Sequence, residues 1–216
     1  MKHSMISRKL AVALVLAISA AAAEVPLPEL RIEPTTGGSI FYIKNVSPAP
    51  LTAYLIELVN YPGSYYALWQ DDLASEPLAA GAERRLTVAN MTVGAVPDYV
   101  KMRAALYADG TSAGIPERVA QLIERRHFTL SVTRDLIGRL DKARTSGTEK
   151  AALIADLKQW ADSMQPGKPS RNASQASINH AAAKSLILDA AAKLDTHPLE
   201  ETLAGLRAAE RALAEK

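Results

Sequence analysis

Apolar and polar residues alternate with a period of two in the first half of the chain and with a period near 3.6 in the second half. A period of two is typical of strands with one buried face, and a period of 3.6 is typical of amphipathic helices. The change lies near Gly114. The pattern therefore predicts an α+β protein in two parts: an antiparallel β-sandwich over residues 24–114 and an α-helical bundle over residues 115–216.

Six or seven short strands are predicted in the first part, with turns rich in Gly, Pro and Asn between them. The clearest segments are 30–33, 40–44, 51–60, 65–70, 83–88 and 100–107. Residues 51–60 are apolar on both faces for most of their length, as expected of a central strand. Residues 100–107 alternate cleanly, which places their apolar side chains from Val100 to Leu106 on one face. Regularly spaced strands of this kind favour an immunoglobulin-like antiparallel β-sandwich.

Helical periodicity begins at Pro116, a residue that suits the first position of a helix. It continues to about Arg144, as one long helix or as two helices broken near residues 129–131, where the helix propensity is weak. Ser146 followed by Glu149 predicts a capping box at the start of the next helix.

The remainder of the chain completes the predicted bundle of three to five helices. Residues 165–172 form a polar linker, and a third helix is predicted from about Ser174 to Leu194. Pro198 begins the last helix. Because the connections are short, we expect consecutive helices to lie antiparallel to one another.

The first 23 residues have the pattern of a secretory signal peptide. Basic residues precede the unbroken apolar run 10–18, and small residues follow it up to a predicted cleavage site near Ala23–Glu24. The alternative is an N-terminal membrane anchor, but the run is shorter than the ~20 residues that span a bilayer. We therefore expect an exported protein that is periplasmic or extracellular.

Composition narrows the possible chemistry. The chain has no cysteine, which excludes a lipid-anchored lipoprotein, disulfides, thiolate catalysis and iron–sulfur clusters. After residue 23 it carries 22 basic and 23 acidic residues, a net charge of −1. Neither nucleic acid nor an anionic membrane is expected as a partner on these grounds. No second apolar run is long enough for a transmembrane segment in the mature chain.

Motifs for catalysis or cofactor binding are not found, so we expect no enzyme, no catalytic residues, no cofactor and no metal site. The pair Glu124 and His127 has the spacing of half a di-iron motif, but the second copy is absent. His180 and His197 add no metal-ligand spacing. A nucleophile elbow and a phosphate-binding glycine loop are also absent.

An aromatic and acidic cluster is the candidate ligand site. Its members are Tyr61, Tyr65, Tyr66, Trp69, Asp71 and Asp72. Aromatic faces beside carboxylates can stack on a sugar or hold a peptide. The alternative is ordinary core packing, because strand alternation turns Trp69 to one face and Tyr66 to the other, and one of these faces must be buried.

Three segments of the first part resemble secreted bacterial immunoglobulin-like modules of the FxLYD type. They are residues 43–47 followed by 51–54, residues 77–83 before 86–88, and residues 106–111, which end in Asp-Gly-Thr. The resemblance covers residues 30–114 and implies binding or architectural roles rather than catalysis.

These observations lead to an exported, non-enzymatic envelope protein that acts in protein–protein interaction or scaffolding, with another envelope or secreted protein as its partner. One alternative is a glycan- or peptide-binding module that uses the aromatic face. Another is a hydrolase with no recognisable motif, because a fold can assemble a catalytic site from distant residues.

Overall fold

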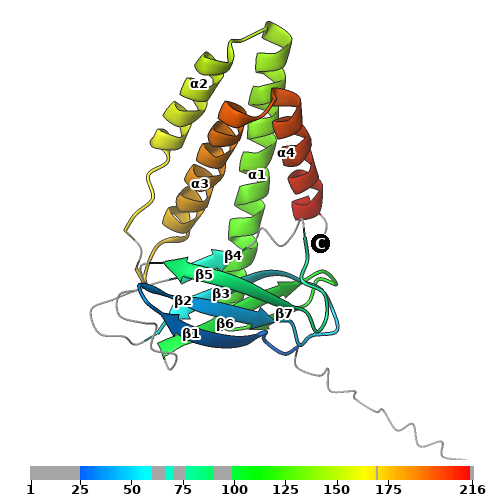
Figure 1. Ribbon diagram of the computed structural model, residues 1–216, viewed down its shortest axis with the longest axis vertical. Helices are drawn as coiled ribbons and strands as arrows, with labels where there is room; N and C mark the ends of the chain where they lie inside the picture. The colour runs from blue at the N-terminus through cyan, green and yellow to red at the C-terminus, as the bar shows by residue number, and fades with distance from the viewer. Residues whose placement is uncertain (1–24, 60–66, 71–75, 90–98, 169, 215–216) are drawn as a thin grey trace, which may run out of the picture.

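The computed structural model describes residues 25–59, 67–70, 76–89, 99–168 and 170–214. Its strands form two antiparallel sheets (Figure 1). One sheet has the order β1-β2-β5, from β1 (Glu29–Thr35), β2 (Gly38–Lys44) and β5 (Glu83–Ala89). The other has the order β4-β3-β6-β7, from β4 (Ala67–Gln70), β3 (Leu51–Leu58), β6 (Val100–Tyr107) and β7 (Ser112–Gly114).

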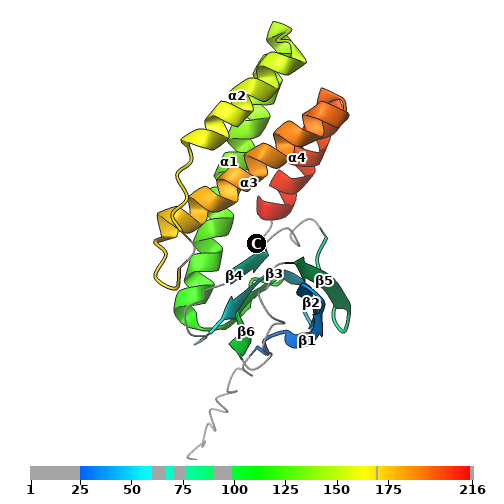
Figure 2. The same ribbon diagram turned by 60° about the vertical axis from the view of Figure 1, so that its left-hand side comes forward.

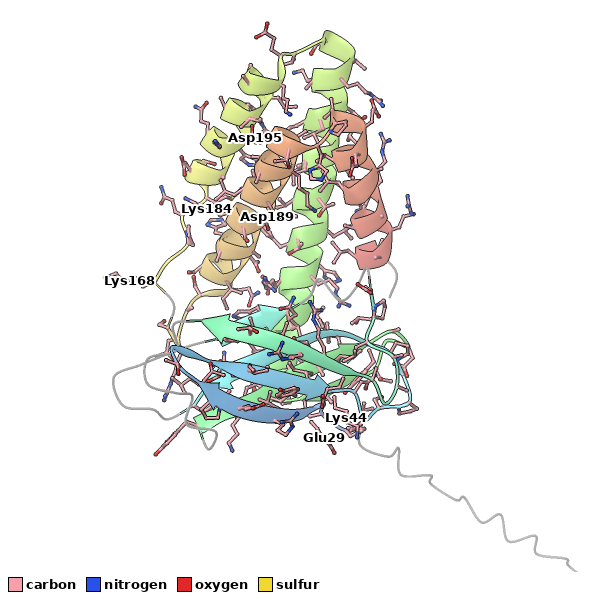
Figure 3. All side chains as sticks on the ribbon, in the orientation of Figure 1. Glu29, Lys44, Lys168, Lys184, Asp189 and Asp195 are labelled. Carbon is pink, nitrogen blue, oxygen red and sulfur yellow. The ribbon has the colours of Figure 1, made fainter. Side chains whose placement is uncertain are left out.

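The two sheets enclose one apolar core, as the predicted sandwich requires. Phe41 and Ile43 of β2 meet Tyr54 and Ile56 of β3 there, and all four are fully buried. Figure 3 places Glu29 and Lys44, register partners at the ends of β1 and β2, on the side of the sandwich away from the helices. The immunoglobulin-like antiparallel sandwich is thus confirmed.

Four helices follow the strands: α1 (Pro116–Ser146), α2 (Lys150–Ser163), α3 (Gln175–Thr196) and α4 (Leu199–Ala214). Of the two predictions for the first helix, the single long one is confirmed. Its weak stretch is held by packing, because Val132, Leu136 and Leu140 are buried against the other helices. Tertiary burial overrides helix propensity here.

Helix α1 is the central element of the molecule. Its N-terminal part lies on the four-stranded sheet, and its C-terminal part packs with α3 and α4 (Figures 1 and 2). Helix α2 packs mainly on α3. The helical core contains Leu136 of α1, Leu157 of α2, Ile187 of α3 and Leu203 of α4, none of which is exposed to solvent. No helix in the described ranges is long and apolar enough to cross a bilayer.

The capping box predicted at Ser146 is wrong. Ser146 is the last residue of α1, and Gly147 follows in the left-handed conformation with φ of 64°. The backbone amide of Thr148 then donates to the carbonyl of Ala143 at 3.0 Å. Glycine at this position is the usual way to end a helix, and this outweighs the capping pattern.

The single apolar face predicted for β6 is also wrong. Val100 and Met102 contact the core between the sheets, whereas Ala104 and Leu106 contact α1 on the opposite face. The pairing explains the switch: Met102 lies opposite Ile56 and Ala104 opposite Leu55, so that Arg103 is an extra residue in the ladder. Such a β-bulge moves the following side chains to the other face of the sheet.

Candidate functional site

The four-stranded sheet is covered on both faces, by the other sheet and by α1. Leu122 of α1 is fully buried against Ala53 and Leu55 of β3 and Ala104 of β6. This explains why β3 is buried along its whole length. The prediction of a central strand is confirmed, and the layer that covers its second face is a helix.

A buried carboxylate joins the sheet to the start of α1. Glu57 of β3 has a side chain only 4% exposed. One of its oxygens lies 3.2 Å from Nε of Arg103, the bulged residue of β6, and the other lies 2.9 Å from Arg118 in the first turn of α1. Burial of a carboxylate is tolerated when charged hydrogen-bond donors surround it. Among the described residues, this group has two cations and one anion.

A second bulge of the β3–β6 ladder contacts α1 further along the helix. Thr52 is the extra residue between the pairs Leu51–Tyr107 and Ala53–Leu106. The guanidinium of Arg126 donates to the carbonyl oxygen of Thr52 at 2.9 Å and to its hydroxyl oxygen at 3.1 Å. Both irregularities of the β3–β6 ladder therefore lie at the junction with α1: Thr52 is contacted by Arg126, and Arg103 binds Glu57, which Arg118 also contacts.

Beside this junction lies a cleft of about 320 Å³, which we call the Trp69 cleft. It is bounded by β4, by the N-terminal part of α1, by the connection between α2 and α3, and by α3 itself. Trp69 and Ile178 supply apolar surface, and Ser170, Ser177 and Ser185 supply hydroxyl groups. Pockets of this size hold small molecules or short segments of a ligand.

Three arginines line the Trp69 cleft: Arg118 and Arg125 of α1 and Arg171 of the α2–α3 connection. The guanidinium carbon of Arg125 lies 5.9 Å from the centre of the Trp69 ring, which is within the range of a cation–π contact. None of the described lining residues is a carboxylate. Arginines are therefore the charged residues among the described lining of the cleft.

Of the predicted ligand residues, the structure places one. Trp69 is half-buried, contacts the cluster of Ala53, Leu55 and Leu122, and lines the cleft. Its neighbour Leu68 faces the core between the sheets. Tyr61, Tyr65, Tyr66, Asp71 and Asp72 lie outside the described residues.

The arginines of the cleft were not predicted as site residues. Arg118 and Arg125 are seven positions apart on α1, a spacing that places them on one face of a helix. That spacing was the only sign in the sequence, and charged residues at such intervals are common on solvated faces.

The histidines have separate locations. The His180 ring lies 6.2 Å from that of Phe128, and the backbone amide of His197, the C-cap of α3, donates to Lys193. His127 lines another hollow beside the β6–β7 turn. Within the described ranges, no three His, Asp or Glu side chains are grouped so that they could hold a metal ion.

The β6–β7 turn contains two titratable groups with shifted pKa values. Burial raises the pKa of Tyr107 to about 12, with the charge of Asp109 as a smaller cause. The Tyr107 hydroxyl donates to the carbonyl of Pro26. The pKa of Asp109 is lowered because the hydroxyl and the backbone amide of Thr111 both donate to its carboxylate, at 2.6 and 3.0 Å.

Comparison of the chain with protein-family models, with curated proteins and with solved structures finds no match.

Proposed function

We propose that this protein is exported and acts without catalysis, by holding an extended segment of another envelope or secreted protein in the Trp69 cleft. Export is supported by the basic, apolar and small residues of positions 1–23 in that order. The observation that carries the binding proposal is that three consecutive residues of β4, the terminal strand of its sheet, line the cleft.

The lining of the cleft supports this position at the strand edge. Ala67, Leu68 and Trp69 are consecutive, and all three line the cleft. Neighbouring side chains of a strand point to opposite faces, so a cleft that touches all three lies along the edge rather than over one face. The strand order puts β4 at the end of its sheet, and no other described strand pairs with it besides β3.

An edge strand offers backbone N–H and C=O groups to an added strand, and pockets for alternate side chains then select the sequence. Here Trp69 and Ile178 form apolar surface for those side chains. An FxLYD-like character of residues 30–114 agrees with this role, because such modules imply binding rather than catalysis.

Site-specific photo-cross-linking in the host cell tests the proposal. A photoreactive amino acid replaces Ser185, which lines the cleft, or Lys168, which lies on the same connection as Arg171 but points away from the molecule (Figure 3). We expect the Ser185 probe to capture one segment of one protein and the Lys168 probe not to do so. Trp69→Ala should abolish the capture.

Tryptophan fluorescence provides an independent measurement on the purified protein. The chain has two tryptophans, so Trp160→Phe leaves Trp69 as the only emitter. A synthetic peptide with the captured sequence should change the Trp69 emission in a saturable way. Equal capture at both probe positions, or emission that ignores the peptide, contradicts the proposal. A response to oligosaccharides alone would replace the protein segment with a glycan.

A further inference from the structure

We infer that the segment bound in the Trp69 cleft has large apolar side chains at alternate positions and that its backbone bonds to the backbone groups of Ala67 and Trp69. This inference rests on the proposed function, because it specifies the chemistry of the segment that binds at the same site. It is carried by the direction of the backbone groups of β4, by the side chains that line the cleft, and by the internal contacts of its arginines.

The first step concerns the hydrogen-bond pattern of β3. The amide of Val59 donates to the carbonyl of Tyr99, and these two residues continue the β3–β6 register by one position. In an antiparallel ladder, residues that bond one neighbouring strand alternate with residues that face the other side. β3 has no extra residue between Tyr54 and Val59. The backbone groups of Ile56 and Tyr54 therefore face β4.

The second step transfers this pattern to β4. Leu68 is the register partner of Ile56, so its backbone groups face β3. The direction alternates along the strand, and the backbone groups of Ala67 and Trp69 consequently face the outer edge of the sheet. No other described strand pairs with β4 at that edge. An added strand can therefore bond to β4 at two positions.

The third step concerns the side chains of the added strand. The side chains of Ala67 and Trp69 lie on the helix side of the sheet, in the cluster that contains Leu55 and Leu122. The Trp69 cleft lies on the same side, because α1 and α3 also line it. Alternate side chains of a strand point to one face of its sheet. Every second side chain of the added strand therefore enters the cleft.

The fourth step concerns the surface that receives these side chains. On α3, the cleft is lined by Ile178 and by the small residues Ala181 and Ala182. Small residues in the wall leave room for large side chains of the ligand. Trp69 and Ile178 provide apolar surface on which such side chains can be buried. The cleft is therefore suited to large apolar side chains.

The arginines of the cleft do not alter this preference, because each has partners within the protein. The guanidinium of Arg118 is held by Glu57 at 2.9 Å and by the side-chain oxygen of Gln121 at 2.7 Å. It also donates to the carbonyl of Arg171 at 3.5 Å. Arg125 and Arg171 have further interactions within the chain. Recognition of the segment therefore depends on the apolar surface and on the backbone of β4.

Binding of defined peptides tests the inference. The probes are three fluorescent octapeptides in which Thr alternates with Leu, with Gln or with Glu, and fluorescence anisotropy measures their affinity for the full mature chain. We expect the Leu peptide to bind at least about tenfold more tightly than the other two, because only its alternate side chains bury large apolar surface in the cleft.

Methylation of the peptide backbone tests the contact with the edge of β4. A methyl group on an amide nitrogen removes a hydrogen-bond donor, as proline does in a strand. Two versions of the Leu peptide carry this group either on every Leu or on every Thr. A strand that adds to one edge bonds through alternate residues, so one version should lose at least about tenfold in affinity and the other should keep it. Loss in neither version, or equal loss in both, overturns the backbone contact.

Substitutions on α3 locate the apolar contact. Ala181 lines the cleft, whereas Ala192 lies on the same helix outside it, and both are exposed. Ala181→Glu places a carboxylate where an apolar side chain of the peptide would be buried, and it should weaken the Leu peptide by at least about tenfold. Ala192→Glu should leave the affinity unchanged. Thermal unfolding verifies that both variants keep the native fold.

The outcomes separate the two proposals. A Gln or Glu peptide that binds as tightly as the Leu peptide overturns the apolar alternation and leaves the proposed function standing. An equal loss in Ala181→Glu and Ala192→Glu also overturns it, because the peptide is then not bound in the cleft. If no peptide binds but the Ser185 probe captures a segment, a captured sequence without alternating large apolar residues overturns the inference. If no peptide binds and the Ser185 probe captures nothing, the proposed function itself fails.

Discussion

The guanidinium of Arg118, in the first turn of α1, lies 2.9 Å from a carboxylate oxygen of Glu57 on β3. The two residues are far apart in the chain, and their contact fixes the start of the longest helix on the sheet. Because α1 also forms the centre of the helical part, this pair connects the sandwich to the helices. It also holds one of the arginines that line the Trp69 cleft.

Removing the charge of Glu57 should destabilise the protein strongly. Glu57→Gln leaves Arg103 and Arg118 close together without their anion, and we expect a loss of about 3 kcal/mol in the free energy of unfolding. Urea denaturation followed by circular dichroism measures it.

The matched control is an ion pair of similar length at the surface. Asp156 lies 3.0 Å from Arg139, and both side chains are more than 40% exposed, so Asp156→Asn should cost less than about 1 kcal/mol. In the double variant Glu57→Gln/Arg118→Gln, part of the loss should be recovered. Equal effects of Glu57→Gln and Asp156→Asn would show that the buried group does not connect the two parts.

Glycine should be required at the junction before α1. Gly114 has φ of +112°, and an added Cβ would collide with the carbonyl oxygen of Arg103 and lie 2.8 Å from Cα of Ala104. Gly114→Ala should therefore lower the free energy of unfolding by more than about 2 kcal/mol, from backbone strain and steric overlap together.

Gly110 in the β6–β7 turn is the control for that substitution. It has φ of +83° but no atom within 4 Å of an added Cβ. Gly110→Ala should cost about 1 kcal/mol, from the backbone conformation alone. Thermal unfolding of both variants compares them, and a Gly114→Ala protein no less stable than Gly110→Ala would exclude the steric contribution.

A single amide side chain should be essential to the turn after β2. Asn45 is fully buried, and its Nδ2 donates to the carbonyls of Ala49 and Leu78, both at 2.9 Å. Asn45→Asp replaces this donor with an oxygen that faces two carbonyl oxygens. We expect a loss of about 3 kcal/mol or more in the free energy of unfolding at neutral pH.

The pH dependence of the Asn45→Asp variant provides the check. Once protonated, the introduced carboxyl group can donate one of the two lost hydrogen bonds, so the difference from the native protein should shrink as the pH falls below about 5. A difference that stays constant with pH would show that protonation of the introduced carboxyl group does not restore a donor.

Stability at high pH should depend on Tyr107. Burial raises the pKa of its phenol from 10.0 to about 12, so that between these values the folded chain keeps a proton that the unfolded chain has lost. The contribution of Tyr107 to the free energy of unfolding is fully present below pH 10 and is lost as the pH rises to about 12, a change of roughly 2–3 kcal/mol. Tyr107→Phe should remove that dependence, and urea denaturation at pH 9 and 11 compares the two proteins. Equal losses of stability between pH 9 and pH 11 in the native protein and in Tyr107→Phe would contradict this role of Tyr107.

The order of strands and helices along the chain could be predicted from periodicity, because the spacing of buried residues is a local property. Ser112–Gly114 was not predicted as a strand, since three residues are too few for a pattern. The choice between one long first helix and two short ones also lay beyond local propensity. It was resolved by the partners of Val132 and Leu136, which come from other helices.

The candidate site was predictable only in part. Trp69 was predicted as a candidate ligand residue because it lies in a cluster of tyrosines, and the structure places it in a cleft. Its arginine neighbours Arg118, Arg125 and Arg171 lie 49, 56 and 102 residues later in the chain, and no local pattern links them to it.

Periodicity determines which segments form strands and which form helices. Composition excludes some chemistries, because the chain has no cysteine, and the N-terminal pattern predicts export. They do not fix which way a side chain points once two strands pair with a bulge. Ala104 and Leu106 face α1, and Glu57 meets Arg118, because register and layer packing arise from contacts between distant segments. Alternation along one strand carries no information about the residue opposite, and for that reason only the tertiary structure shows the Trp69 cleft between sheet and helices.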